Sequence, residues 1–358
     1  MVNVCCDQDK ADKIILMEKI QVKLKNRQSA VIVGECLNNL DKYLNGRKNF
    51  IITDKNVNEI YGERFPDSPV YIVEPGEKSK DLGVVADICR WLLDLGADRH
   101  AFITGIGGGV VCDLTGFVAA VYLRGVNFGF VATSLLAQVD AAIGGKNGVN
   151  LDGYKNIIGT FTQPEFVICD VDMLISLPEK EYVNGMAEVI KHALINDYGQ
   201  FAHLEEFSIP ILAKERNEME FIVGHSARIK AGIVGNDELE QGERRKLNLG
   251  HTWGHAVEKV TSLPHGESVS LGLAFSARLS VKKGILKEEE KERILKLLAD
   301  FDLPVINEAD PSTVFDALVK DKKREGGSIH FVLMNGIGNV VIEPIDIEEL
   351  KNFALNGN

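Results

Sequence analysis

Short apolar runs separated by helix-length amphipathic segments mark the first half of the chain. Between about residue 29 and residue 173, runs of apolar and β-branched residues recur, as in SAVIVG, NFIITD, PVYIVE and AFITGIGGG. Longer segments such as LGVVADICRWLLDLG lie between them. This alternation is typical of parallel strands in βαβ units. It predicts an α/β domain with a doubly wound parallel sheet, whose ligand lies at the carboxyl ends of the strands.

The pattern changes after about residue 173. Long amphipathic segments follow, such as EYVNGMAEVIKHALI, MEFIVGHSARIKAGIV and KEEEKERILKLLADFDLP. Their apolar positions recur at helical spacing. A chain of 358 residues also exceeds what one hydrophobic core of about 250 to 300 residues organises. We therefore expect an α/β domain in residues 1–177 and a mainly α-helical domain in residues 178–358, with the active site between them.

The net charge and the N-terminal sequence limit which partners and which cellular location we expect for the protein. The chain has 40 basic and 52 acidic side chains, a formal charge of −12, which argues against nucleic acid and anionic membranes as partners. MVNVCCDQDKADKII lacks an apolar stretch with a cleavage site, and no run of about 18 apolar residues occurs in the sequence. We expect a cytoplasmic protein. Because its net charge is negative, any anion must bind at a local cluster of basic groups.

A glycine-rich turn indicates a nucleotide site. AFITGIGGGVVCDLTGF combines a buried strand, the glycines 107–109 and an apolar helix with Asp113. Glycines admit a ligand close to the backbone, and the helix N-terminus offers N–H groups to a pyrophosphate. By itself such a triplet is often only a tight turn. However, Asp54 in ITDKN, and Glu77 with Lys80 in PGEKSK, follow other strands of the same edge and could bind the ribose and the adenosine side.

Cations gather in the motif segments of this acidic chain. Lysines in glycine-flanked loops often face only solvent. Cations from several distant segments nevertheless suit a substrate with more than one anionic group, such as a carboxylate and a phosphate. The residues concerned, with the polar residues beside them, are Arg124, Asp140, Lys146, Lys155, Asn156, Lys191, Lys230, Arg244, Lys322 and Lys323.

The sequence also contains the elements of a metal site. His251 and His255 share a face if they lie on a helix, and they could bind one ion together. Thr252 follows His251, so the HExxH motif of metalloproteases is absent. A catalytic zinc ion needs three N or O ligands and an open position. Glu188 is a further candidate, and spacing leaves the third ligand open among His255, His265, His192 and His225.

Eight motifs together resemble the 3-dehydroquinate synthase family: GGGVVCDLTGF, LRG, LLAQVDAAIGGKNGVN, KNIIGTF, GMAEVIKHALI, LNLGHTWGHAVE, HGESVSLGL and DKK. The resemblance runs in order from about residue 50 to 335. It implies a Rossmann-like NAD-binding domain followed by a helical metal-binding domain. The implied reaction converts 3-deoxy-D-arabino-heptulosonate 7-phosphate to 3-dehydroquinate and phosphate, the second step of the shikimate pathway. Transient oxidation by NAD, phosphate elimination, reduction and aldol closure leave no net redox change.

The resemblance also implies roles for individual residues. Zn²⁺ or Co²⁺ would be held by Glu188, His251 and His265, whereas His255 would belong to the substrate pocket. Substrate and catalytic residues would be Lys146, Asn156, Lys191, Lys230, Arg244, Asn248, His255, Lys322 and, across a homodimer interface, Arg124. NAD would contact Asp54, Asn56, Glu77, Lys80, Gly108, Gly109, Asp113, Thr133, Ser134, Asp140, Lys146, Lys155, Met173 and Ser176.

The motifs leave open the role of individual basic residues and some competing functions. The DKK motif does not settle whether Lys322 or Lys323 faces the phosphate. We expect Arg244 to serve the substrate carboxylate and to contribute little to the stability of the unliganded fold. The competing interpretations are a sister sugar phosphate cyclase of the 2-deoxy-scyllo-inosose or valiolone type, a metal-dependent polyol dehydrogenase and a non-catalytic NAD-binding protein. The complete set of lysines favours a 3-dehydroquinate synthase over all three of these alternatives.

Overall fold

The computed structural model describes residues 17–24, 28–322 and 327–356, apart from the side chains of residues 321 and 322. Within these residues, seven strands form one sheet in the order β1-β2-β9-β6-β5-β3-β4. Strand β1 runs antiparallel to β2 at one edge, and the other pairs are parallel. The strands are β1 Glu18–Lys23, β2 Gln28–Val33, β3 Asn49–Asp54, β4 Val70–Val73, β5 Phe102–Gly107, β6 Asn127–Ala132 and β9 Phe166–Cys169.

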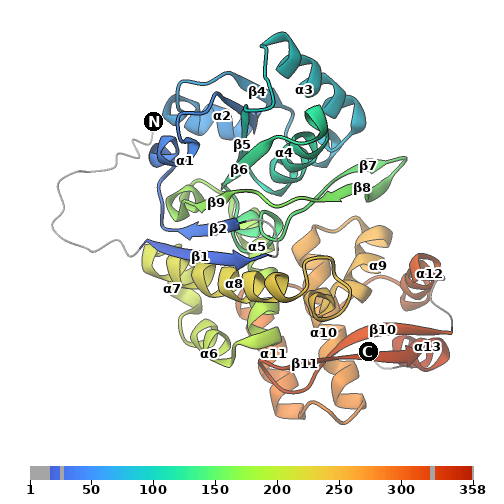
Figure 1. Cartoon of the computed structure of the whole chain (residues 1–358). Coiled ribbons are helices and arrows are strands. Elements are labelled where there is room, and N and C mark those ends of the chain that lie inside the picture. The colour runs from blue at the N-terminus through green and yellow to red at the C-terminus, as the bar shows by residue number, and fades with distance from the viewer. Residues whose placement is uncertain (1–16, 25–27, 323–326, 357–358) are drawn as a thin grey trace.

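Helices cover both faces of this sheet (Figure 1). They are α1 Asp41–Leu44, α2 Lys55–Tyr61, α3 Leu82–Asp94 and α4 Gly109–Val121. Successive strand residues point to opposite faces. Accordingly, Phe50 and Ile52 of β3 join the apolar cluster of α3 and α4, and Ile51 joins the cluster that contains α1 residues. The predicted doubly wound α/β fold is confirmed.

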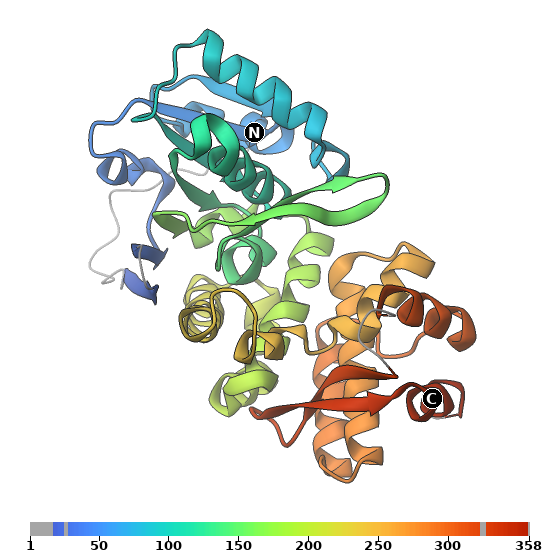
Figure 2. The same ribbon diagram turned by 45° about the vertical axis from the view of Figure 1, so that its right-hand side comes forward.

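The second half is mainly helical, as predicted. Its helices are α5 Glu179–Asn196, α6 Tyr198–Glu206, α7 Ser208–Leu212, α8 Arg216–Asn236, α9 His251–Thr261, α10 His265–Lys282, α11 Glu288–Asp300, α12 Pro311–Lys322 and α13 Ile347–Asn356. An antiparallel hairpin of β10 (Ser328–Met334) and β11 (Val340–Asp346) packs against α10 (Figure 2). The hydrophobic pattern of the sequence does not predict this hairpin. The division of the chain at residue 177 stays a prediction.

A second hairpin joins the two halves at their margin. Strands β7 (Lys146–Leu151) and β8 (Tyr154–Phe161) pair antiparallel and extend toward α9 (Figure 1). Their turn is Asp152-Gly153, with φ of 49° and 81°. Positive φ at both turn residues is the type I′ geometry that suits the twist of a two-residue hairpin loop. The hairpin thereby carries Lys155 from the sheet domain to the helical half.

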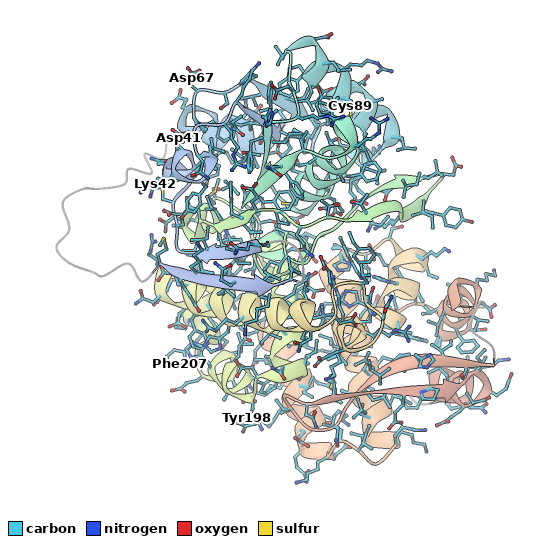
Figure 3. All side chains as sticks on the ribbon, in the orientation of Figure 1. Asp41, Lys42, Asp67, Cys89, Tyr198 and Phe207 are labelled. Carbon is cyan, nitrogen blue, oxygen red and sulfur yellow. The ribbon has the colours of Figure 1, made fainter. Side chains whose placement is uncertain are left out.

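Charged side chains occur both on the surface and in the interior of the protein. In Figure 3, Asp41, Lys42 and Asp67 project outward from the sheet domain. In contrast, Lys191 and Arg244 are almost completely buried. Among the described helices, none combines the length and the apolar character that a membrane crossing requires.

Glycines allow α9 and α10 to approach each other closely. A Cβ atom on Gly272 of α10 would lie 1.8 Å from the backbone oxygen of Gly250, and one on Gly254 of α9 would lie 2.6 Å from the backbone oxygen of Ser268. Gly250 itself has a φ of 77°. Backbone cannot yield as a flexible side chain can. The contact therefore fixes the two helices that begin with His251 and His265.

We expect the substitution Gly272→Ala to destabilise the protein, because the new methyl group collides with backbone. Overpacking of this kind costs about 1 to 3 kcal/mol or more. Gly232→Ala in α8 is the matched control, since a Cβ there meets nothing within 4 Å. It should be neutral or stabilising by up to about 1 kcal/mol. Thermal or urea unfolding measures both, and equal stability of the two variants would contradict the close packing.

Candidate active site

The glycine-rich turn lies at the reversal point of the strand order. Strand β5 ends at Gly107, Gly108 caps α4, and β3 with Asp54 at its end is the neighbouring strand. From β3 the chain goes to β4 on one side, and from β5 to β6 on the other. The crevice outside such a switch point is where open α/β sheets bind ligands. A Cβ on Gly108 would lie 3.2 Å from Oγ of Ser134, so the turn has little room for a side chain.

Lys80 connects the loop after β4 with α4 and the β7–β8 hairpin. It is buried, and its Nζ lies 2.6 Å from Oδ2 of Asp113 and 2.5 Å from Oδ1 of Asn156. Burial raises the pKa of Asp113 to about 6, although the charge of Lys80 acts in the opposite direction. Exposed Glu77 accepts a hydrogen bond from Nδ2 of Asn150, at 2.8 Å. Three of the predicted NAD residues are thus brought together.

The other predicted NAD residues on this edge differ in accessibility. Asp54 caps α2 by accepting a hydrogen bond from the backbone N–H of Val57, at 3.1 Å. Asn56 is exposed on the first turn of α2, Thr133 is buried, and Ser134 is half-buried after β6. All four follow strands of the parallel sheet, which places them at its carboxyl edge.

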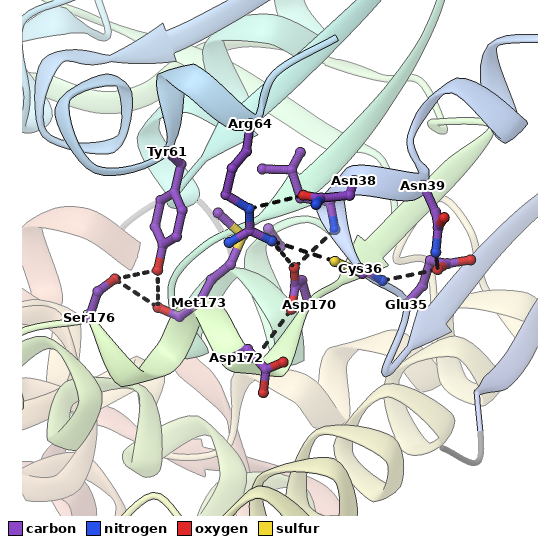
Figure 4. Close-up of polar contacts among 12 residues, drawn as sticks. Glu35, Cys36, Asn38, Asn39, Tyr61, Arg64, Asp170, Asp172, Met173 and Ser176 are labelled. Atoms are coloured by element: carbon purple, nitrogen blue, oxygen red, sulfur yellow. Dashed lines mark hydrogen bonds and ion pairs between the residues drawn. The ribbon is translucent and has the colours of Figure 1, made fainter. Parts of the chain in front are cut away.

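Met173 and Ser176 follow β9 and contact α2 (Figure 4). Oγ of Ser176 donates to the carbonyl of Met173 at 3.1 Å and lies 2.6 Å from the hydroxyl of Tyr61. The side chain of Met173 is 1% exposed and belongs to the core on that face of the sheet. In this arrangement the methionine serves packing. The role of both residues toward NAD stays a prediction.

A buried ion network surrounds Asp140. Lys230 of α8 donates to its carboxylate at 2.7 Å and to its backbone carbonyl at 2.6 Å, and Lys191 of α5 lies 3.8 Å from the same carboxylate. Burial favours a raised pKa of Asp140, but the two lysines outweigh it and hold the pKa well below its ordinary value. Burial lowers the pKa of Lys230 to about 8, against the attraction of Asp140. The network fixes both lysines in place.

Glu188, His251 and His265 come together from three helices. Each offers a ligand atom within 4.8 Å of the others, and Nε2 of the two histidines lies 3.4 Å and 3.5 Å from Oε1 of Glu188. Glu188 is fully buried and ion-paired with Lys191. Among the described residues, neither carboxylate oxygen has a hydrogen bond of ordinary geometry. A buried carboxylate whose Oε1 faces two imidazoles forms, with them, a donor set that fits a divalent metal ion.

Protonation of the three residues follows from their surroundings. Burial acts to raise the pKa of Glu188, but the charge of Lys191 outweighs it and lowers the pKa. Burial, with the charge of Lys191, holds the pKa of His251 well below its ordinary value. Burial also acts to lower the pKa of His265, but the nearby carboxylates of Glu188 and Glu258 raise it to about 9. An ion binding here displaces a proton from His265.

Other histidines lie near this group. His255 lies one turn after His251 on α9, and their rings are 5.1 Å apart and nearly perpendicular. Exposed His255 forms a second possible ligand group with Glu258 and His265, and buried His192 forms a third with Asp140 and Glu188. Among the described residues, His225 belongs to none of these groups. The predicted ligand set is therefore one of three that the geometry brings together.

Arg244 is more structural than expected. Its side chain is buried, Nη1 donates to the carbonyl of Glu238 at 2.5 Å, and Nη2 donates to the carbonyl of Gly144 at 2.9 Å. Against the expectation that Arg244 contributes little to the unliganded fold, its guanidinium already satisfies two backbone acceptors. A role toward the substrate carboxylate stays a prediction.

Two acidic residues of the site were not expected from the sequence. Glu240 accepts a hydrogen bond from Nδ2 of Asn248 at 3.1 Å and pairs with Lys146. Glu258 pairs with Lys155 at 2.5 Å. Glu258 is the last residue of the quoted GHTWGHAVE motif, which was a usable signal. Glu240 stands in a loop with a φ of 60° and has no such signal.

Two predicted residues are not placed with the others. Arg124 is exposed and follows α4, which begins at the carboxyl edge of the sheet and ends at the opposite edge, before β6. Within one copy of the chain, Arg124 therefore lies apart from the other candidate residues. The side chain of Lys322, and the whole of Lys323, lie outside the described residues.

Comparison with known proteins identifies relatives over most of the chain. The 3-dehydroquinate synthase N-terminal model matches residues 70–184, and the C-terminal model matches residues 185–324. A 3-dehydroquinate synthase of Acidithiobacillus ferrooxidans is 44% identical over 304 residues, 82% of this chain and 84% of that protein. One from Alkaliphilus metalliredigens is 37% identical over 349 residues, 94% of this chain and 98% of that protein.

A solved structure also aligns with nearly the whole chain. It is 2-epi-5-epi-valiolone synthase from Streptomyces hygroscopicus with NAD⁺ and Zn²⁺ bound. It is 27% identical with a TM-score of 0.85, covering 93% of this chain and 97% of that one. The chain is therefore less similar in sequence to this sister cyclase than to the two synthases above.

We expect Arg244→Ala to lower the free energy of unfolding, because two backbone carbonyls lose their donors. The cost is about 1 to 3 kcal/mol for a buried acceptor left unpaired, as at Gly144, and less for the part-buried carbonyl of Glu238. Arg245→Ala is the control, since it removes the same charge from the adjacent, less buried position. Urea unfolding without substrate compares the two variants. A wild-type midpoint for Arg244→Ala would show that these hydrogen bonds do not support the fold.

Proposed function

The chain belongs to the 3-dehydroquinate synthase family, and we propose that it converts 3-deoxy-D-arabino-heptulosonate 7-phosphate to 3-dehydroquinate and phosphate. The observation that carries this proposal is the position of Lys191. This buried lysine is ion-paired with Glu188 of the metal group and lies 3.8 Å from Asp140 at the cofactor edge. A cation at that junction suits an anionic substrate held between metal and nucleotide.

We assign two cofactors to the site. NAD⁺ would bind at the glycine turn between β3 and β5, and Zn²⁺ or Co²⁺ would bind Glu188, His251 and His265. The 27% identical valiolone synthase, solved with both NAD⁺ and Zn²⁺, supports this pairing. When bound, the metal supplies a Lewis acid for substrate hydroxyl oxygens, and the nucleotide accepts and returns a hydride.

The chain's own residues would orient the substrate. Lys191, Lys230, Arg244 and Asn156 would serve its carboxylate and hydroxyls, and Lys146, Asn248, His255 and Lys322 would serve its phosphate. Lys146 and Asn248 both contact one carboxylate, that of Glu240. Two groups that already share an anionic partner are well placed to share a phosphate, and Glu240 would then have to move aside.

We also propose a cytoplasmic homodimer. Arg124 lies at the edge of the sheet opposite to the glycine turn, in an exposed segment with a φ of 67°. If this arginine serves the substrate, the simplest donor is a second copy of the chain. The whole proposal is favoured over a sister cyclase by identity, since the synthases are 44% and 37% identical and the valiolone synthase is 27% identical.

The proposed reaction predicts phosphate release from the heptulosonate phosphate with only catalytic amounts of NAD⁺, because the hydride returns to the carbon it left. Phosphate and 3-dehydroquinate should form in equal amounts while absorbance at the NADH band stays flat. Steady NADH accumulation would identify a polyol dehydrogenase. Turnover of a hexose phosphate, with no phosphate released from the heptulosonate phosphate, would identify a sister cyclase of the 2-deoxy-scyllo-inosose type.

The proposed ligand set predicts different results for two histidines. His265→Ala should lower the bound metal to a small fraction of one ion per chain, because it removes a direct ligand. His255→Ala should keep close to one ion per chain and lose turnover. Metal analysis of protein purified without chelator, with unfolding curves as a check of the fold, tests this. Retention in the first variant and loss in the second would reverse the assignment.

A further inference from the structure

The two candidate metal-binding histidines are oriented in the same way. Each directs Nε2 toward Oε1 of Glu188, at 3.4 Å for His251 and 3.5 Å for His265. Each therefore turns Nδ1 toward a different neighbour. For His251 this neighbour is the backbone carbonyl of Leu249, at 3.2 Å, and for His265 it is Oε2 of Glu258, at 3.5 Å.

An acceptor at Nδ1 decides what an imidazole can do at Nε2. In neutral imidazole one nitrogen carries the proton and the other carries the lone pair. A carboxylate or carbonyl that accepts from Nδ1–H leaves the lone pair at Nε2, fixes the ring orientation and makes the nitrogen more basic. His251 has a backbone acceptor that no side-chain substitution removes. For His265 the acceptor is a side chain.

Glu258 is itself held from the other half of the protein. Its side chain is 14% exposed, and Oε1 accepts from Nζ of Lys155, on β8, at 2.5 Å. Its second oxygen, Oε2, is the one near His265. One carboxylate thus bridges the hairpin of the sheet domain and a candidate metal ligand.

We propose that Glu258 is the positioning residue of this metal group: its carboxylate holds Nδ1 of His265 so that Nε2 faces the ion, and Lys155 holds the carboxylate in place. This inference rests on the proposed function, because it takes Glu188, His251 and His265 as the ligands. It adds a role for Glu258 that the ligand set does not contain.

A different role for Glu258 is that of a direct ligand, with His255 and His265. The contacts favour positioning. Oε1 of Glu258 is already engaged by an ammonium group, and His255 is exposed. The carboxylate of Glu188 is fully buried, and although Lys191 engages one of its oxygens, the other, Oε1, faces both His251 and His265. An ion bound at Glu188 would therefore bind Nε2 of His265, because Glu258 lies at the other ring nitrogen, Nδ1.

The experiment measures metal affinity directly, on the full-length chain, by competition of Zn²⁺ with a chromophoric chelator. Glu258→Ala should weaken affinity about 10- to 100-fold, the range for loss of such an outer partner. Glu258→Gln should weaken it less, because the amide oxygen can still accept from Nδ1. Both variants should still bind one ion per chain at saturation. Lys155→Met should give a smaller weakening than Glu258→Ala.

Lys259→Met is the matched control. Lys259 also reaches the hairpin from α9, with its ammonium group 6.0 Å from the ring centre of Tyr154. Among the described residues, the ion pairs of His265 are with Glu188 and Glu258 and not with Lys259. It should bind Zn²⁺ with wild-type affinity. Unfolding curves of the metal-free variants show whether each one folds, and the Glu258→Gln variant carries the test if the alanine variant does not.

The outcomes separate this inference from the function it rests on. Wild-type Zn²⁺ affinity in folded Glu258→Ala or Glu258→Gln overturns the positioning role. Loss of stoichiometric binding at saturating Zn²⁺ in either variant overturns it too, and makes Glu258 a ligand. If His251→Ala and His265→Ala themselves retain wild-type affinity, the proposed metal site fails, whatever the Glu258 variants do. Graded weakening, with the control unchanged, supports the proposal.

Discussion

The fully buried carboxylate of Glu188 is the constraint around which the helical half is arranged. A carboxylate removed from water is unstable unless positive or donating groups surround it. Here α5 supplies Lys191, one turn further on, and α9 and α10 supply His251 and His265. The close glycine packing of α9 on α10 makes this convergence possible. Because Lys191 also faces Asp140, the same charge balance extends to the nucleotide edge of the sheet domain.

Much of the fold followed from local patterns in the sequence. Runs such as NFIITD and AFITGIG are buried on both faces, which is why they stand out as parallel strands. Strand β1 (EKIQVK) and the β10–β11 hairpin were missed because their apolar runs are short and cannot be assigned by periodicity alone. The Asp152-Gly153 turn of β7–β8 does carry a hairpin signal in the sequence, because aspartate followed by glycine favours a two-residue turn.

The site was predictable where chemistry is local and not where it depends on long-range contacts. The shared face of His251 and His255 follows from helical spacing, but the choice of a third ligand does not. The pairing of Lys155 with Glu258 spans 103 positions, and that of Lys146 with Glu240 spans 94. Arg244 illustrates the same limit, since its basic character suggests a role toward the substrate but does not reveal that its guanidinium also donates to the backbone of Gly144, 100 positions away.

The linker between α9 and α10 gives the metal group a property of its own. Ser262 has a φ of 59° and turns the chain back, and Pro264 stands just before His265, with its own φ restricted by its ring. Both imidazoles are thus anchored at helix starts joined by a short, stiff tether. An ion that binds there closes a chelate ring whose conformational entropy was lost when the helices packed. Because the linker is already ordered before an ion binds, the choice among ions depends mainly on the fixed spacing of the donor atoms.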